Sequence, residues 1–168
     1  MAKKNFRRAW HFIADDLKLG YNDRRTVEVG KKLPAPGIVQ LCHGGMHAST
    51  NLTSAMNYVD DKQPILCRVI VEGEIDEDWS TDFNGSPSKI CGRNRTVLWM
   101  KRLPKNVLKK ALRGSTNKRA KDVAWYIGSW EKASWDHLRQ AVSFLSRTEK
   151  RRVEQYIRQW AYDNGCPA

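Results

Sequence analysis

The feature that most constrains this chain is a change in hydrophobic periodicity near Pro104. Before Pro104 the apolar residues form short, β-branched runs typical of strands, of which 65–71 is the longest. After it they recur every three or four positions, as in amphipathic helices. We therefore predict an α+β fold, with a small mixed or antiparallel sheet and one short helix, followed by a basic helical C-terminal part. The predicted division is a basic N-terminal arm over 1–9, an α+β domain over 10–100 and a helical extension over 101–168 packed on it.

The first hundred residues contain the predicted sheet. Runs at 26–29, 38–41, 65–71 and 96–100 are predicted strands, and Pro64 precedes the one expected to be central. A helix of about two turns is predicted after the capping residues at 49–51, because apolar residues follow at helical spacing: Leu52, Ala55, Met56 and Val59. The acidic stretch 76–88, with Gly85 and Pro87, is predicted to be a loop.

The last third is predicted to hold four helices. The first begins at Pro104 and ends at Gly114, the second spans 117–130, and Ser134 caps the third. The fourth begins with a capping box formed by Ser146 and Glu149. The last two helices form either a DNA-binding helix-turn-helix or an ordinary αα-hairpin with a solvated basic face. We also expect four tryptophans to bridge the helices and the strand domain: Trp125, Trp130, Trp135 and Trp160.

Charge is distributed unevenly along the chain. The net charge is +12, and residues 99–168 hold sixteen of the thirty Lys and Arg against six Asp and Glu. Such a block indicates a polyanionic partner, and we predict that it binds phosphate backbones of DNA or RNA without strong sequence preference. The residues predicted to do so are Lys101, Arg102, Lys105, Lys109, Lys110, Arg113, Lys118, Arg119, Lys121, Arg147, Lys150, Arg151 and Arg152.

Composition also excludes some classes of protein. No apolar run approaches the roughly 20 residues of a membrane span, and the basic N-terminus lacks the apolar stretch of a secretory signal. Four cysteines do not make a disulfide scaffold, so a cytoplasmic location is expected.

Motifs for catalysis or metal binding are mostly missing. The sequence has no phosphate-binding Gly-Lys-Ser/Thr loop, no Gly-x-Ser-x-Gly elbow and no His-Glu-x-x-His helix. Cys42, His43 and His47 are close in sequence, but no Cys-x-x-Cys pair accompanies them, so no metal site is expected. Cys42 and Cys67 are interpreted as small buried residues beside strands, and a nucleophilic pair of Cys42 with His47 is the alternative.

A series of short motifs lies between Trp10 and Met100. They are Trp10-His11-Phe12, Gly20-Tyr21-Asn22-Asp23-Arg24-Arg25, Val27-Glu28-Val29-Gly30, Leu41-Cys42-His43-Gly44-Gly45-Met46-His47-Ala48-Ser49, Ala55-Met56-Asn57-Tyr58, Cys67-Arg68-Val69, Gly73-Glu74-Ile75 and Arg95-Thr96-Val97-Leu98-Trp99. Together they resemble an uncharacterised domain common in phage and prophage genomes. The resemblance implies a phage origin and no established activity.

A second pattern in the same region consists of His11, the 45–58 segment with Tyr58, and Glu74. It has a weaker similarity to ADP-ribosyltransferases, in which an early His, a segment opening a helix that ends in Tyr, and a strand leading to a Glu hold NAD. The resemblance implies that His11 would bind ribose, Tyr58 would stack on nicotinamide and Glu74 would supply the carboxylate. His47 stands where an aromatic residue is expected.

Two hypotheses follow. The first is a phage-encoded basic protein, without a cofactor, that binds nucleic acid or a host protein or nucleoprotein in the host cytoplasm. The second is an enzyme that uses NAD to modify nucleic acid or a host protein, with His11, His47, Tyr58 and Glu74 as its catalytic residues. A third reading, a virion or interaction module, places the Trp-rich helices against a partner.

Overall fold

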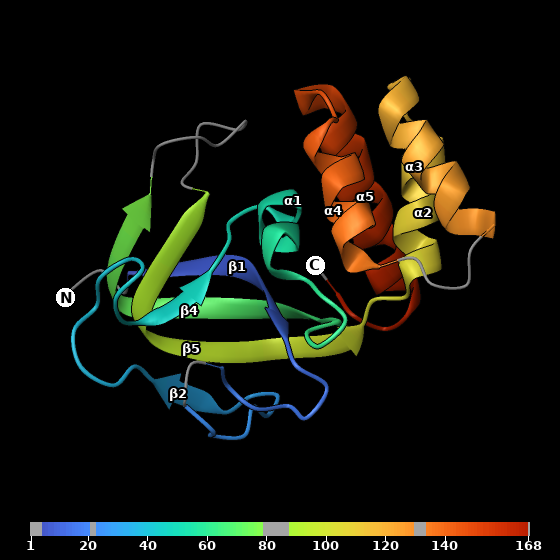
Figure 1. Cartoon of the computed structure of the whole chain (residues 1–168). Coiled ribbons are helices and arrows are strands. Elements are labelled where there is room, and N and C mark those ends of the chain that lie inside the picture. The colour runs from blue at the N-terminus through green and yellow to red at the C-terminus, as the bar shows by residue number, and fades with distance from the viewer. Residues whose placement is uncertain (1–4, 21–22, 79–87, 130–133, 168) are drawn as a thin grey trace.

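The computed structural model describes residues 5–20, 23–78, 88–129 and 134–167, with the side chains of 126–129 left aside. The order is β1 (Phe6–Ile13), β2 (Lys32–Pro34), β3 (Met46–Ala48), α1 (Leu52–Ala55), the 3₁₀ turn η1 (Met56–Tyr58), β4 (Ile65–Asp78), β5 (Lys89–Arg102), α2 (Lys105–Arg113), α3 (Lys118–Ser129), α4 (Trp135–Ser143) and α5 (Arg147–Asp163). Figure 1 shows α2–α5 gathered at one end of a curved sheet, with α1 beside them. The α+β prediction is confirmed, and no described helix is long and apolar enough to cross a bilayer.

The sheet is antiparallel and curls on itself. Its order is β1-β4-β5-β2, and β3 also pairs with β5. Directly after β3, Ser49 exchanges two main-chain hydrogen bonds with Trp10 of β1, of 2.7 and 2.8 Å. The bend needs a residue without a side chain at Gly92, because a Cβ there would lie 2.3 Å from a methyl carbon of Val71. The two hydrogen bonds between Trp10 and Ser49 thus bring the β1 edge and the β3 edge of the curled sheet together.

Alternate residues of β1 enter two different cores. Ala9 and Ile13 point into a cluster enclosed by the curled sheet, together with Val69 of β4 and Val97 of β5. Trp10 and Phe12 point the other way, into a cluster that the helices complete. Both faces of β1 are thus buried over much of its length.

The second cluster joins the strand domain to the helices. Trp10 and Trp99 meet edge to face with their ring centroids 5.8 Å apart. Trp135 is 2% exposed within this cluster, and Trp160 packs against it, so these two tryptophans bridge the two parts as predicted. Trp125 does not, because its side chain is 74% exposed. Trp130 lies outside the described residues.

Several predicted boundaries differ from the structure. The segment 26–29 makes only isolated bridges at Thr26 and Val29, and 38–41 makes one at Gln40. β1 begins at Phe6, so part of the predicted arm 1–9 is a strand of the sheet. β4 continues to Asp78, into the predicted loop 76–88, of which 79–87 lies outside the described residues. The predicted strand 96–100 is the second half of β5.

Candidate functional site

Some residues predicted to bind nucleic acid are already engaged within the protein. Arg102 at the end of β5 pairs with Asp15, and Lys105 at the start of α2 pairs with Asp61. Lys101 donates a hydrogen bond to a main-chain carbonyl of the C-terminal segment. These three basic residues therefore have partners within the protein, and the carboxylates among those partners come from distant parts of the chain.

The other basic residues of α2 and α3 remain available to a ligand. They are exposed or half-buried and form no ion pair with any residue that the structure describes: Lys109, Lys110, Arg113, Lys118, Arg119 and Lys121. On α5, Arg147, Arg151 and Arg152 are exposed, whereas Lys150 is half-buried and lines a separate cavity. The positive charge thus concentrates on the α2–α3 pair.

A groove of about 540 Å³ runs over α2 and α3. The described residues that line it are Arg113 from α2 and Lys121, Asp122 and Trp125 from α3. An indole that is 74% exposed beside a guanidinium and an ammonium is a combination seen where bases stack and phosphates pair. We call these four residues the α2–α3 groove.

The buried carboxylate of Glu149 fixes the turn between α2 and α3. One of its oxygens accepts hydrogen bonds from Ser115 Oγ at 2.6 Å and from the main-chain N–H groups of Thr116 and Asn117. The other oxygen accepts from the N–H and Oγ of Ser146, which completes the predicted capping box. The hydrogen bond from Ser115, followed by those from Ser146, holds the pKa of Glu149 far below its usual range. The first turn of α5 therefore packs on the α2–α3 turn and orients the groove.

Two of the residues predicted for NAD chemistry, His11 and His47, lie near a buried arginine. His11 on β1 faces the inside of the curled sheet, and Arg95 Nη1 donates to the main-chain oxygen of His47 at 2.7 Å. Burial, Arg95 and His47 together hold the pKa of His11 well below its usual value. Burial, Lys89 and Arg95 also lower that of His47. These surroundings therefore favour the neutral form of both imidazoles.

The other two predicted catalytic residues lie elsewhere. Tyr58 follows α1, and its ring faces the ammonium of Lys89, 5.7 Å from the ring centroid. Glu74 is 61% exposed and pairs with Arg93 at 2.6 Å. No hydrogen bond or ion pair joins Glu74 to either histidine in the described part of the chain. The structure brings His11 and His47 together and leaves Tyr58 and Glu74 with other partners.

The cysteines differ in how far they are buried. Cys67 and Cys91 are buried, and burial raises the pKa of their thiols to about 12 and about 11. Cys42 is exposed, so its expected burial is wrong. Its main-chain N–H donates to Nε2 of His47 at 3.3 Å. This hydrogen bond occupies the nitrogen that a general base would use.

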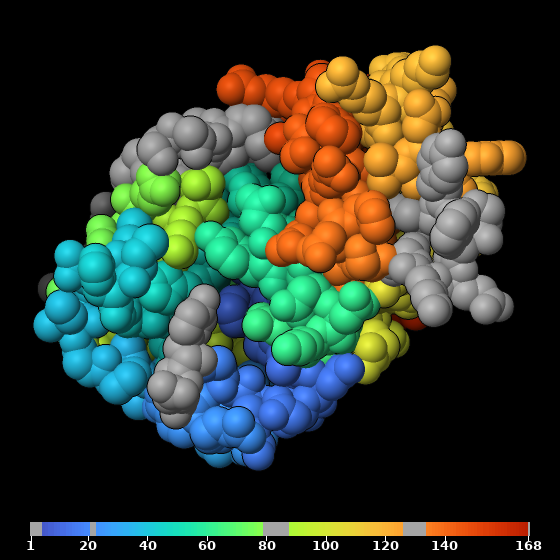
Figure 2. Space-filling view, in the orientation of Figure 1, coloured from blue at the N-terminus to red at the C-terminus, as the bar shows by residue number. Residues whose placement is uncertain are grey.

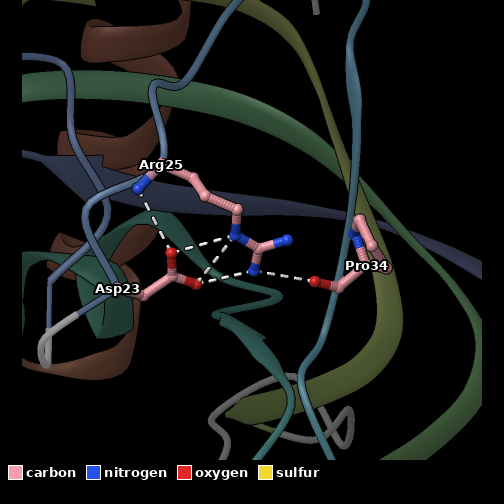
Figure 3. A network of polar contacts seen from close by, with 3 residues as sticks. All are labelled: Asp23, Arg25 and Pro34. Atoms are coloured by element: carbon pink, nitrogen blue, oxygen red, sulfur yellow. Dashed lines mark hydrogen bonds and ion pairs between the residues drawn. The ribbon is translucent and has the colours of Figure 1, made fainter.

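The Asp and Arg of the Gly-Tyr-x-Asp-x-Arg motif hold the loop after β1. Figure 3 shows the guanidinium of Arg25 between the carboxylate of Asp23 and the carbonyl of Pro34. The ion pair measures 2.6 Å and the hydrogen bond to Pro34 2.8 Å. The hydrogen bond from Arg25 lowers the pKa of Asp23. This motif fastens the loop to β2.

A family model now accounts for most of this strand domain. The model of a domain of unknown function, DUF7666, matches residues 7–108. The chain belongs to this family. The matched region covers the curled sheet from the second residue of β1 onward, α1 and the start of α2, while all four residues of the α2–α3 groove lie beyond it. No curated protein and no solved structure matches the chain.

The sequence did not predict the exposure of Trp125. It falls close to the apolar stripe of α3, which favoured burial. The available signal was its neighbourhood, because Lys121 and Asp122 precede it and charged residues seldom flank a fully buried indole. The contact of Lys89 with Tyr58 was also not predicted, because nothing in the sequence around Lys89 distinguishes it from a solvated lysine.

Proposed function

We propose that this protein binds nucleic acid through the α2–α3 groove, with Trp125 as a stacking platform and the surrounding Lys and Arg as phosphate contacts. The observation that carries the proposal is the exposed indole of Trp125 in a groove shared with Arg113 and Lys121. A tryptophan that is 74% exposed adds nothing to the core and presents a large apolar face to water. A base that stacks on it would cover that face.

The charge around the groove supports the same ligand. Lys109 and Lys110 extend the positive surface along α2, and Lys118 extends it along α3. These cations repel one another in the free protein, and a phosphate backbone relieves that repulsion while it releases condensed counterions. Because stacking on an indole needs an unpaired base, a single strand fits this groove better than a duplex.

The proposal is tested by fluorescence anisotropy with labelled single-stranded DNA, single-stranded RNA and duplex DNA. Replacing Trp125 by Ala should weaken binding to single strands by about 5- to 100-fold, from the usual strength of one stacked base. Tyr162→Ala is the matched control, because Tyr162 is 67% exposed but lies in the last turn of α5. Equal losses in the two variants, or no binding to either nucleic acid at low salt, would contradict the proposal. The second result would make the basic surface a docking face for an acidic host protein.

A further inference from the structure

A second cavity lies between the strand domain and the helices and has a different chemistry. Its volume is about 330 Å³, at the lower end of the range for small-molecule sites. Residues of α1 and η1 form one wall, Ser88 and Lys89 at the start of β5 form another, and Ser143 and Lys150 from the α4–α5 side form the third. Figure 2 shows these three elements meeting on the front of the molecule.

The lining of this cavity is polar and positively charged. Among the residues that the structure describes, it holds four serines, a threonine, an asparagine, Tyr58 and the ammonium-bearing Lys89 and Lys150, and no carboxylate. Hydroxyls, an amide and two ammonium groups together form a set of donors suited to an anion with several oxygens. The ligand that this lining favours is therefore anionic.

The nearest carboxylates on α5 do not neutralise Lys150. Glu149 accepts hydrogen bonds from the α2–α3 turn and from Ser146. Glu154 accepts from Thr53 and pairs with Arg158. Both carboxylates are buried and directed away from solvent. Neither carboxylate forms an ion pair with Lys150 in the described part of the chain.

Lys89 is held at the opposite wall. Its Nζ lies 3.3 Å from Cys42 Sγ and 5.7 Å from the centroid of the Tyr58 ring. These contacts fix the ammonium beside an aromatic ring that is 47% exposed. The cavity therefore offers a cation and a flat stacking surface next to each other, with a second cation across from them.

We propose that this cavity binds a nucleoside monophosphate or a similarly small phosphate ester. The phosphate lies between Lys89 and Lys150 and accepts hydrogen bonds from the serine hydroxyls. The planar ring of the ligand packs against Tyr58. The site is separate from the α2–α3 groove and shares no lining residue with it.

The test is isothermal titration calorimetry of the full chain with AMP, adenosine and inorganic phosphate. AMP should bind saturably, and adenosine should bind at least about tenfold more weakly because it lacks the charge-assisted hydrogen bonds. Lys89→Gln and Lys150→Gln should each weaken AMP by about tenfold. Tyr58→Ala should weaken AMP binding by a larger factor than the binding of inorganic phosphate, because AMP also loses the surface on which its ring packs.

Lys62→Gln is the matched control, since Lys62 is exposed and lies outside the cavity. Circular dichroism confirms that each variant is folded. Unchanged AMP affinity in both lysine variants, or no saturable AMP binding to the wild-type protein, would overturn the proposal. Trp125→Ala should leave AMP binding intact, so failure here and failure of nucleic-acid binding are told apart.

Discussion

The carboxylate of Glu154 on α5 accepts two hydrogen bonds from Thr53 on α1, one from the main-chain N–H at 3.0 Å and one from Oγ1 at 3.2 Å. The two residues are 101 positions apart in the sequence. Both are buried where the DUF7666 domain meets the helical part. This contact is the polar counterpart of the apolar cluster that joins the same two parts.

Replacing Glu154 by Ala should lower the free energy of unfolding by about 3 kcal/mol, because the N–H and hydroxyl of Thr53 would stay buried without an acceptor. Urea denaturation followed by circular dichroism measures this value. Gln155→Ala serves as the control, because the side chain of Gln155, next to Glu154 in the sequence, is exposed. This substitution should change the free energy of unfolding by no more than about 0.5 kcal/mol. Equal effects of the two substitutions would show that the Thr53–Glu154 contact does not contribute to the free energy of unfolding.

Glu149 should make the stability of the protein sensitive to acid. Its pKa in the folded protein is lowered, first by the hydrogen bond from Ser115, whereas an unfolded glutamate titrates near pH 4.3. Its contribution is therefore complete above the unfolded pKa and is lost progressively as the pH falls below it. The urea midpoint measured from about pH 7 to pH 3 should fall more steeply in the wild type than in Glu149→Gln. Glu28→Gln, at an exposed position, should follow the wild-type curve.

We expect the side chain of Arg68 to lower the free energy of unfolding. Its guanidinium lies over the ring of Trp10, 4.4 Å from the centroid, and the guanidinium of Arg158 lies 5.3 Å from the same centroid. The Nε and Nη1 groups of Arg68 have no hydrogen-bond partner among the residues that the structure describes. Burial, followed by the charges of Arg158 and Arg8, lowers the pKa of Arg68 to about 10.

Arg68→Met should therefore raise the free energy of unfolding by about 1 kcal/mol, because a partly buried, poorly compensated charge is replaced by an apolar chain. Arg139→Met is the contrasting variant, since Arg139 bonds Asp136 and the carbonyl of Asn57, and it should not stabilise the protein. Thermal unfolding of both variants and of the wild type measures these changes in stability. A destabilised Arg68→Met would mean that the stacking on Trp10 outweighs the cost of the charge.

Binding to nucleic acid should depend strongly on salt. If about five phosphates are neutralised, the logarithm of the affinity for duplex DNA should fall with the logarithm of salt concentration with a slope of about −4 to −5, and for single strands with a smaller slope. Reversing the charge of Lys109, Lys110 and Arg113 should flatten the slope and weaken binding to all sequences alike. Anisotropy titrations at several salt concentrations measure it. A slope near zero would exclude phosphate contacts.

The helices could be predicted from the sequence because their signals are local. The apolar stripes and the Ser146–Glu149 capping box lie within single helices, and the structure confirms them. The end of β4 could not be predicted from the sequence. A run of acidic residues is typical of a loop, and only the fold shows that basic residues on neighbouring strands pair with them. Glu72 pairs with Lys32 of β2 and Glu77 with Arg7 of β1, so the charges that suggest a loop are ion pairs between strands.

The candidate sites were predictable only in part. The basic residues of α2 and α3 follow from composition, but Asp15 and Asp61 reach Arg102 and Lys105 through the fold alone. β1 was missed because Arg7 and Arg8 precede its apolar residues and both of its faces enter a core, which removes the usual alternation.

The apolar cluster that contains Trp10 also contains Cys166, near the other end of the chain. A ribosome delivers the N-terminus first, so Trp10 and Phe12 leave the exit tunnel long before α5 exists. Until translation has passed α5, their side chains have no helices to cover them. The order of synthesis therefore leaves two large aromatic side chains of the first strand without part of their core until α5 has been made.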